Sequence, residues 1–438
     1  MSPEAQSIRP FELPALFREV PNRWAIEPLR NVAKFTTGWT PPTGDDSLYD
    51  GERLWANISD LKTKYVGDTA KTISDAAAQS SRIAVSPVGS LLFSFKLSIG
   101  QVAIVSREMY TNEAIATFKD TERLSMPFAY YALPIWLVQN AIENIYGAKL
   151  LNAHLMRAAK LAIPPLNEQR QIAEYLDRET GRIDELIAKQ EQLVATLTER
   201  RQAVIAQAVT RGLDSNTSLK DSGSVWIGPI PRSWQVVPCG LYTLLIQTGP
   251  FGSQLHSEEY VENGVPLVNP MHFTDGRIVT SAGMSVEATK ALELNRHALQ
   301  LDDVIIARRG ELGRSAVVTI ESVGFLCGTG SAIVRLRTNQ IDPRFFQLVF
   351  SSRRVRDVLV QYSVGSTMDN LSAATVASLR IPVPLLAEQK EIVAFVESQG
   401  ARIGVVVEKA REMIALLRER RAALISAAVT GKIDVRGL

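Results

Sequence analysis

Three arginines on one glycine-containing turn, Arg308, Arg309 and Arg314, are well placed in this sequence to bind an anionic partner. The turn follows a strand-like apolar run over residues 304–307. An arginine at such a position can contact a phosphate or form two hydrogen bonds to the edge of a guanine base. The turn therefore predicts a contact with nucleic acid, with an ordinary solvated loop as the alternative.

Loops that combine glycine with hydrogen-bonding side chains recur in the two halves of the chain. Residues 36–40 (TTGWT) correspond to residues 247–253 (QTGPFGS), and the loop around Lys96 corresponds to the arginine turn. A third pair lies around Asn152 and Asn370. The predicted DNA-binding residues are Thr37, Gly38, Trp39, Lys96, Lys149, Asn152, Thr248, Gly249, Ser253, Arg308, Arg309, Arg314, Thr367 and Asn370.

The sequence contains no recognisable catalytic or metal-binding set. The one Gly-Lys pair, at 431–432, has Ser426 where a phosphate-binding Walker loop needs its first glycine. Residues 269–272 (NPMH) lack the second proline and the aromatic residue of a loop that holds a flipped adenine. The four histidines are scattered without metal-ligand spacing. We therefore predict that this chain is not an enzyme and has no catalytic or metal-binding residues.

Other parts of the chain must position these loops, and two long segments are copies of each other. Residues 168–214 and 388–434 align without a gap, and both contain the blocks Glu-Arg-Arg and Ala-Val-Thr. Apolar residues recur in both at heptad spacing, with charged residues between them. We predict long helices over 167–211 and 387–431 that pair as an antiparallel coiled coil, although the spacing alone does not determine their direction.

The predicted seam between these helices has the same positions in both copies. Its residues are Ile172, Leu176, Ile183, Leu186, Leu193, Leu197 and Val204 in the first copy, and Ile392, Val396, Ile403, Val406, Met413, Leu417 and Leu424 in the second. Gly212 and Gly431 stand where each helix is expected to end. A helix with one apolar stripe must cover it, and the copy in the same chain is the simplest partner.

The rest of the sequence predicts two mixed α/β domains, so the fold class is α+β with an internal pseudo-twofold repeat. Trp24 and Trp234 begin the domains and are predicted to be core anchors. In the first domain we expect strands over 90–95 and 101–106 and a helix over 128–146. The predicted segments are a first domain at 1–163, a first helix at 164–212, a linker at 213–224, a second domain at 225–381 and a second helix at 382–438.

Composition sets further limits. The chain has 438 residues, of which 46% are hydrophobic and 21% charged, as expected for a globular protein of several domains. No apolar run approaches the roughly 20 residues of a membrane span, and the N-terminus lacks the pattern of a secretory signal. Cys239 and Cys327 permit at most one disulfide and no zinc cluster. We expect a cytoplasmic protein without a membrane segment.

The order domain, long helix, domain, long helix, with Pro-Leu-Asn-Glu-Gln-Arg-x-Ile at 165–172, resembles the specificity subunit of Type I restriction-modification systems. The corresponding start of the second helix, at 384–392, is less typical. The resemblance implies two target recognition domains, each reading one half of a split, asymmetric site in double-stranded DNA. It also implies that the helices fix the distance between the domains and that the subunit itself catalyses nothing.

The same resemblance implies partner subunits. Two methyltransferase (modification) subunits would dock on the helices, carry S-adenosylmethionine and methylate adenine N6. Restriction (motor-nuclease) subunits would add cleavage that depends on ATP and Mg²⁺, and this chain would hold no cofactor. The predicted partner-docking residues are Glu168, Gln169, Arg200, Arg201, Glu388, Gln389, Arg420 and Arg421.

Two alternatives stay open at this point. One is a coiled-coil scaffold with protein-binding globular domains. The other is the DNA-recognition part of a fused restriction enzyme, against which the missing catalytic loops argue. DNA binding that weakens with salt would separate the DNA-binding functions from the scaffold.

Overall fold

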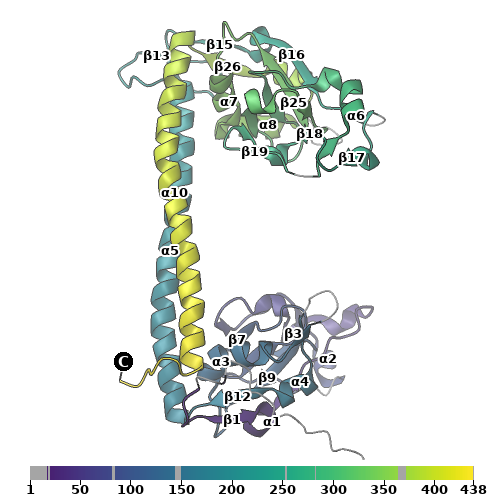
Figure 1. The fold of residues 1–438 in the computed structure, drawn as a ribbon, viewed down its shortest axis with the longest axis vertical. Helices are drawn as coiled ribbons and strands as arrows, with labels where there is room; N and C mark the ends of the chain where they lie inside the picture. The colour runs from purple at the N-terminus through teal and green to yellow at the C-terminus, as the bar shows by residue number, and fades with distance from the viewer. Residues whose placement is uncertain are drawn as a thin grey trace, which may run out of the picture. The chain divides into compact units, whose positions relative to one another are not determined.

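The structure, a computed structural model, describes residue 17 and residues 20–80, 84–143, 149–251, 254–281, 283–363 and 371–437. The chain divides into unit 1, residues 1–190 and 412–438, and unit 2, residues 191–411. Each unit contains one mixed α/β domain and parts of both long helices, α5 (Leu166–Arg211) and α10 (Leu386–Val429) (Figure 1). The predicted α+β class with an internal repeat is confirmed, because both units have the same plan.

Two sheets form the domain of unit 1. The larger sheet has the strand order β2 (Phe35–Thr37), β9 (Ile115–Phe118), β6 (Leu91–Ser94), β7 (Val102–Val105) and β4 (Tyr65–Val66). The smaller has the order β5 (Thr72–Ile73), β3 (Tyr49–Ala56) and β8 (Tyr110–Thr111). Strand β6 is buried along its whole length, and α3 (Met126–Val138) packs against β6 and β7. The strands predicted at 90–95 and 101–106 are present with shorter bounds.

Unit 2 repeats this arrangement. Its first sheet has the order β16 (Thr243–Thr248), β25 (Ser331–Leu336), β22 (Val304–Ala307) and β23 (Ser315–Val317). Its second sheet has the order β17 (Tyr260–Val261), β21 (Ser285–Val286), β18 (Val265–Val268) and β24 (Leu326–Cys327). An antiparallel pair leads into each long helix: β1 (Ala25–Pro28) with β12 (Lys160–Ile163), and β15 (Gln235–Pro238) with β26 (Arg380–Val383).

Within each unit, the beginning of one long helix packs beside the end of the other, so the helices run antiparallel as predicted. In unit 1, Leu176 of α5 shares a hydrophobic core with Val429 of α10. In unit 2, Val209 of α5 shares a core with Ile392 of α10.

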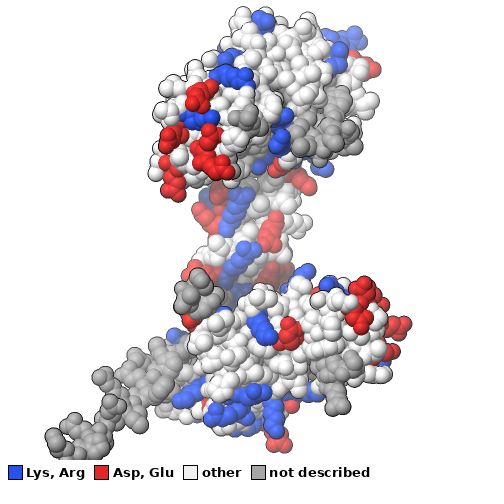
Figure 2. Space-filling model, turned by 90° about the vertical axis from the view of Figure 1, so that its right-hand side faces the viewer, with Lys and Arg blue, Asp and Glu red and all other residues white. Residues whose placement is uncertain are grey.

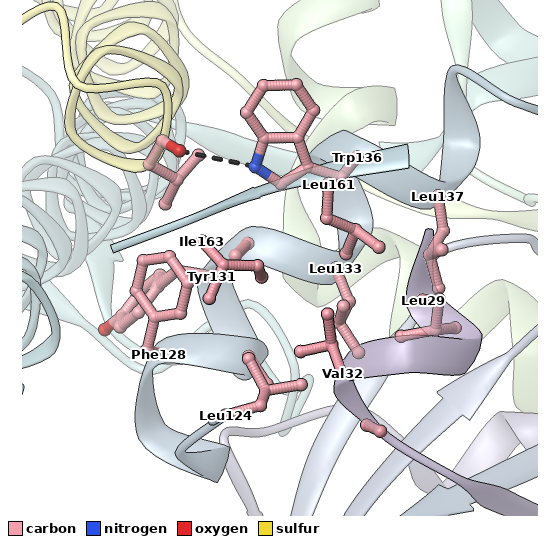
Figure 3. Packing of buried hydrophobic residues seen from close by; sticks show 14 of the residues in the cluster. Leu29, Val32, Leu124, Phe128, Tyr131, Leu133, Trp136, Leu137, Leu161 and Ile163 are labelled. Atoms are coloured by element: carbon pink, nitrogen blue, oxygen red, sulfur yellow. Dashed lines mark hydrogen bonds between the residues drawn. The ribbon is translucent and has the colours of Figure 1, made fainter. Parts of the chain in front are cut away.

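The core of unit 1 shows how the domain holds both helices. Trp136 of α3 is buried, and its Nε1 donates to the backbone oxygen of Val429 in α10 at 3.3 Å (Figure 3). Leu133 and Leu137, also of α3, point toward α1 (Leu29–Val32) (Figure 3). Apolar side chains from distant parts of the sequence therefore build one core.

The ends of the long helices agree with the prediction within two residues. Gly212 and Gly431 follow α5 and α10 with φ angles of 72° and 76°. This left-handed conformation is common just after a helix, and glycine adopts it without a steric penalty from a Cβ atom.

The prediction of which residues are buried between the helices is wrong in the middle of the seam. Four of its residues are between 39% and 47% exposed: Leu186, Leu193, Val406 and Met413. The buried residues of α10 in this stretch are Val407, Ala410 and Ile414 instead. Near the helix starts, Ile172 and Ile392 also pack into domain cores. A helix covered only by another helix buries a narrow stripe, and this leaves part of the apolar surface exposed.

The same hydrogen bond ties the start of each long helix to its domain. In unit 1, Trp24 Nε1 donates to Glu168 Oε1 at 3.1 Å, and Arg23 Nη2 donates to the same oxygen at 2.6 Å. In unit 2, Trp234 Nε1 donates to Glu388 Oε1 at 3.0 Å. Both tryptophans are buried, as predicted for core anchors.

A buried glutamine next to each glutamate completes this pattern. Gln169 accepts a bond from Ser125 N at 2.9 Å and donates to two backbone carbonyls. Gln389 accepts a bond from Asp342 N at 2.7 Å and donates to two carbonyls in the same way. The two glutamines and their neighbouring glutamates therefore face their own domains. This placement does not fit the outer docking surface expected for them, because a buried polar side chain uses its hydrogen-bonding groups inside the chain.

Two further segments differ from the prediction. Helix α3 ends at Val138, where Asn140 Nδ2 donates to Trp136 O at 2.7 Å and closes the last turn. The predicted linker contains β13 (Leu219–Lys220), which pairs with β14 (Ile230–Pro231). Among the described residues, we find no helix whose length and apolar character would let it span a membrane.

Candidate nucleic-acid interface

Three segments meet at one end of the larger sheet in unit 1: residues 37–40, 95–100 and 111–115. Backbone hydrogen bonds of 2.9–3.3 Å join the first and second segments to the third. We call these segments, together with Asn57, the loop edge of unit 1. It contains four predicted residues, Thr37, Gly38, Trp39 and Lys96.

Unit 2 has a corresponding loop edge made of residues 248–251, 308–313 and 327–331 together with Asn269. Backbone hydrogen bonds of 3.0 Å again join the first and second segments to the third. This edge contains the predicted residues Thr248, Gly249, Arg308 and Arg309. The structure thus brings together, in each unit, the first two kinds of loop that the sequence singled out.

The glycines of the two loop edges serve packing within the chain. A Cβ atom on Gly38 would lie 1.9 Å from the backbone oxygen of Thr111, and one on Gly249 would lie 2.0 Å from that of Gly328. No side chain fits at such distances. The requirement for glycine therefore comes from the neighbouring backbone of the same unit, independently of any bound partner.

Arg308 carries a partly buried positive charge at the loop edge of unit 2. Its Nε atom is buried and has no hydrogen-bond partner among the described residues. Burial, and then the charge of Arg309, lower the pKa of Arg308, although an arginine stays protonated in proteins. Arg308 as a whole is only half-buried, and its charged guanidinium suits an acceptor-rich ligand such as a phosphate or a guanine edge.

The loop edge of unit 1 has a different charge pattern. Thr40 donates a hydrogen bond to Glu113, and this bond lowers the pKa of Glu113. The positive charge of Lys96 lowers the same pKa further. Glu113 and Lys96 are both exposed. A carboxylate can accept a hydrogen bond from cytosine N4, so the two edges offer different groups to a base sequence. Glu113 belongs to no sequence motif and is not among the predicted residues.

Arg314 is held by contacts inside the domain. Its Nη2 donates to the backbone oxygen of Phe273, and its Nη1 lies 3.8 Å from Glu311 Oε2. With Arg201 and Arg356 it lines a cavity of about 160 Å³. The predicted trio of arginines is therefore divided between the loop edge and this cavity.

The third pair of predicted loops is only partly described. Asn152 caps α4 (Ala153–Ala158), where its side chain accepts a bond from Leu155 N at 2.9 Å. The corresponding cap, on α9 (Ala373–Ser378), is Ser372, whereas the sequence comparison had matched Asn152 with Asn370. Lys149 is exposed on β11 (Lys149–Leu150), opposite Glu143 of β10 (Ile142–Glu143). The predicted residues Ser253, Thr367 and Asn370 lie outside the described residues.

An asparagine at the same place in both loop edges was not singled out. Asn57 follows β3, Asn269 follows β18, and each caps a short 3₁₀ turn. Asn269 Oδ1 also accepts a bond from Gly330 N at 3.1 Å. Residues 55–57 (WAN) and 267–269 (LVN) both end in this asparagine, and a comparison of the two halves could have found the pair from them.

A cationic groove in unit 1 also escaped the sequence patterns. The groove measures about 540 Å³, and its cations are Arg30, Lys34 and Lys119. No carboxylate is among its described lining residues. Pairing of Phe35 in β2 with Phe118 in β9 brings two of the cations together. Lys and Arg side chains gather along the lower rim of this unit in Figure 2. Such a surface suits the phosphate backbone of DNA.

The predicted helix arginines fall into two classes. Arg200 and Arg420 are exposed. Arg421 Nε lies 2.8 Å from Asp184 Oδ1, and Arg201 Nη1 lies 2.7 Å from Asp275 Oδ1. The exposed pair is therefore the one available to a partner.

The described acidic, histidine and cysteine side chains are not arranged as a metal site. No three His, Cys, Asp or Glu side chains among them lie together as metal ligands would. Cys239 and Cys327 are buried and unbridged, and burial raises the pKa of Cys239 to about 12. A thiol with so high a pKa is a poor nucleophile at neutral pH. His272 and His297 are buried, and burial lowers the pKa of both.

Comparison with known proteins identifies relatives of this chain. The EcoBI specificity subunit of Escherichia coli is 24% identical over 322 residues, which cover 72% of this chain and 67% of that relative. The MjaIX specificity subunit of Methanocaldococcus jannaschii is 20% identical over 439 residues, 96% of each chain. A solved chain from a study of complex assembly and conformational transition of the type I R-M system has a similar fold. Its TM-score is 0.69 at 18% identity, over 94% of this chain and 99% of that one.

The family match rests on both domains. The sequence model of the Type I restriction modification DNA specificity domain matches residues 21–195 and 256–406, more than half of the chain. The relatives agree with this match, since they too are specificity subunits of Type I restriction enzymes. The chain therefore belongs to the family of Type I restriction enzyme specificity subunits, which recognise DNA and have no catalytic activity of their own.

Proposed function

We propose that this chain reads a bipartite, asymmetric site in double-stranded DNA, with one recognition domain on each half-site. The observation that carries this proposal is a shared scaffold with unlike loop edges. Both units repeat the sheets and the Trp–Glu and Gln hydrogen bonds, but Lys96-Leu97-Ser98 in one edge stands where Arg309-Gly310-Glu311 stands in the other. Different side chains on the same scaffold suit two different base sequences.

Exchange of one domain tests this division. Residues 225–381 are replaced by those of another specificity subunit, and methylated adenines are mapped on DNA treated with the assembled complex. We expect one half of the recognised sequence to change while the other half and the spacer stay the same. A change in both halves would contradict the division.

The paired helices are proposed to set the number of unread base pairs between the half-sites. Two readers on one face of B-DNA must be spaced by about 34–36 Å or a multiple of it. A matched insertion of seven residues after Leu193 and after Glu408 preserves the heptad pattern and lengthens both helices. It adds about 10 Å, close to three base pairs, so the spacer should grow by about three. An unchanged spacer would exclude this role.

Two N6-adenine methyltransferase subunits that carry S-adenosylmethionine are proposed to dock on the helices. The support is the exposed apolar surface at Leu186 and Leu193 and at their repeat equivalents, Val406 and Met413. Exposed apolar groups at matching positions suit two copies of one partner. Motor-nuclease subunits that use ATP and Mg²⁺ would complete a cytoplasmic complex, and this chain would hold no cofactor.

Charge substitutions test this docking by counting subunits in native mass spectra. Leu186→Lys or Val406→Lys alone should remove one methyltransferase copy, and both together should remove two. Leu219→Lys, at an exposed leucine in the short strand β13, is the matched control and should retain both copies. Full assembly of the double variant would exclude this surface as the docking site.

A protein-binding scaffold is the competing function. It predicts that the purified complex shows no salt-dependent binding to DNA. A DNA-reading subunit that contacts phosphates should instead bind DNA with a log affinity that falls linearly with log salt concentration. The cationic groove favours the second outcome.

A further inference from the structure

The tip of the turn between β6 and β7 carries a leucine in an unfavourable setting. Leu97 is 90% exposed and has a φ angle of 56°. Left-handed backbone conformation is costly for a residue with a Cβ atom. A fully exposed leucine also forgoes the burial that stabilises apolar side chains. The fold of unit 1 therefore gains nothing from this side chain.

Unit 2 contains the same turn without this cost. Gly310 takes the place of Leu97 and has a φ angle of 71°, and Gly313 at 85° takes the place of Gly100 at 92°. The two turns thus share one backbone conformation. Glycine satisfies that conformation in unit 2, so the turn itself does not require a leucine in unit 1.

Hydrogen bonds hold the backbone of the turn that carries the leucine. Gly100 N donates to Ser94 O at 2.9 Å, Ile99 N donates to Leu97 O at 2.8 Å, and Ser94 Oγ donates to Lys96 O at 3.1 Å. Lys96 and Ser98 beside it are exposed and polar. Leu97 belongs to none of the hydrophobic clusters of the described residues. A single apolar side chain at the tip of a hydrogen-bonded turn, between polar neighbours at the loop edge, matches the apolar wedges that proteins insert into DNA.

We propose that Leu97 inserts between adjacent base pairs of the half-site that unit 1 reads and partly unstacks them. Lys96 lies next to it in the turn and supplies a cation for the adjacent phosphate. Gly310 provides no such wedge, so the half-site read by unit 2 stays stacked at the corresponding step. This inference rests on the proposed function, because it requires unit 1 to bind DNA through its loop edge.

The test uses the assembled methyltransferase complex and DNA with 2-aminopurine placed in turn at each purine of both half-sites, away from the methylated adenines. Wild-type protein should raise 2-aminopurine fluorescence at one step of the half-site assigned to unit 1 by domain exchange, and at no step of the other. Leu97→Gly, which matches unit 2, should abolish this signal. It should weaken specific binding about tenfold, the effect of removing one interaction with a base.

Two further measurements keep the outcome unambiguous. Leu97→Gly should unfold no more easily than wild type, since it relieves the backbone, whereas a structural role would lower its stability. Leu97→Met retains an apolar wedge and should keep most of the signal. If the 2-aminopurine signal is unchanged in Leu97→Gly, the proposal is overturned. It is also overturned if Leu97→Gly loses a bound methyltransferase subunit but still binds DNA normally, because Leu97 would then contact the subunit. Absence of any DNA binding by the wild-type complex would instead contradict the proposed function itself.

Discussion

The two units use the same interior and different surfaces. Each has a buried tryptophan that donates to the first glutamate of a long helix, at 3.1 Å in unit 1 and 3.0 Å in unit 2. The exposed turn, in contrast, carries Leu97 in unit 1 and Gly310 in unit 2. In the domains, the buried positions that make these hydrogen bonds are alike in the two units, whereas the exposed turn differs. A buried likeness of this kind serves the shared scaffold, and the difference at the turn changes the groups that each loop edge offers to a partner.

A second contrast lies on the helices themselves. Arg421 pairs with Asp184 on the other helix in unit 1, at 2.8 Å. Its equivalent in unit 2, Arg201, pairs with Asp275 of the domain instead, at 2.7 Å. The position that matches Asp184 is Gly404, which offers no carboxylate. The two equivalent arginines therefore bind different carboxylates.

Replacing the buried glutamines should have the largest effect and should affect both units equally. Gln169→Leu or Gln389→Leu leaves one amide and two carbonyls without their partner, and each buried unsatisfied group costs about 1–3 kcal/mol. We expect each variant to lose about 3 kcal/mol in the free energy of opening its own unit, measured by hydrogen exchange. Gln192→Leu on an exposed helix face is the control. A small effect in only one unit would break the equivalence.

Alanine at the two loop-edge glycines tests whether they serve packing or DNA approach. Gly38→Ala and Gly249→Ala place a Cβ about 2 Å from a backbone oxygen and should each cost about 2 kcal/mol of stability. Gly44→Ala, where a Cβ meets nothing within 4 Å, should be close to neutral in denaturation experiments. Normal stability with weakened DNA binding in the first two variants would show instead that the glycines make room for DNA.

The cationic groove should distinguish unit 1 in DNA binding. Replacing Arg30, Lys34 and Lys119 by glutamine should reduce the slope of log affinity against log salt by about 0.9 for each phosphate that the protein no longer neutralises. The recognised sequence should stay the same, because phosphates carry no base information. Replacing Arg178, Arg182 and Lys189 by glutamine removes the same charge from residues in ion pairs and should change the slope little. Equal slopes for both triple variants would exclude the groove.

Restoring the missing carboxylate should have the smallest effect. Gly404→Asp gives unit 2 the residue that Asp184 supplies in unit 1, and a Cβ there meets nothing within 4 Å. Removing a helical glycine and adding a surface ion pair should stabilise unit 2 by about 0.5–1 kcal/mol in urea denaturation. Gly404→Asn controls for the added side chain. If Arg201 keeps its bond to Asp275, the two variants should be equally stable.

The long helices could be predicted because their repeat and heptad spacing are regular over many turns. Glu168 and Gln169 were predicted to dock a partner, because nothing in the sequence shows that the domain covers the start of the helix and bonds to both side chains. Asn152 was aligned with Asn370 because the two residues have the same spacing in similar loops. The helix caps show instead that Ser372 is the structural equivalent of Asn152.

The candidate interface could be predicted only in part. The turns with glycine and arginine were visible, because their chemistry is local. The cationic groove was not, because strand pairing brings residues from near position 30 and near position 119 together. Likewise, the sequence gives no sign that Arg314 turns toward Phe273 while Arg308 stays at the edge.

The bond between Trp136 and Val429 has a consequence for biosynthesis. The interior of unit 1 includes Ala428, Val429 and Val435, residues that the ribosome adds after all of unit 2. Unit 1 therefore cannot complete its core when its first residues leave the ribosome. The residues of unit 2 are all synthesised before unit 1 is complete. A nonsense mutation at position 412 would leave unit 2 whole and would expose apolar surface on unit 1, which is translated first.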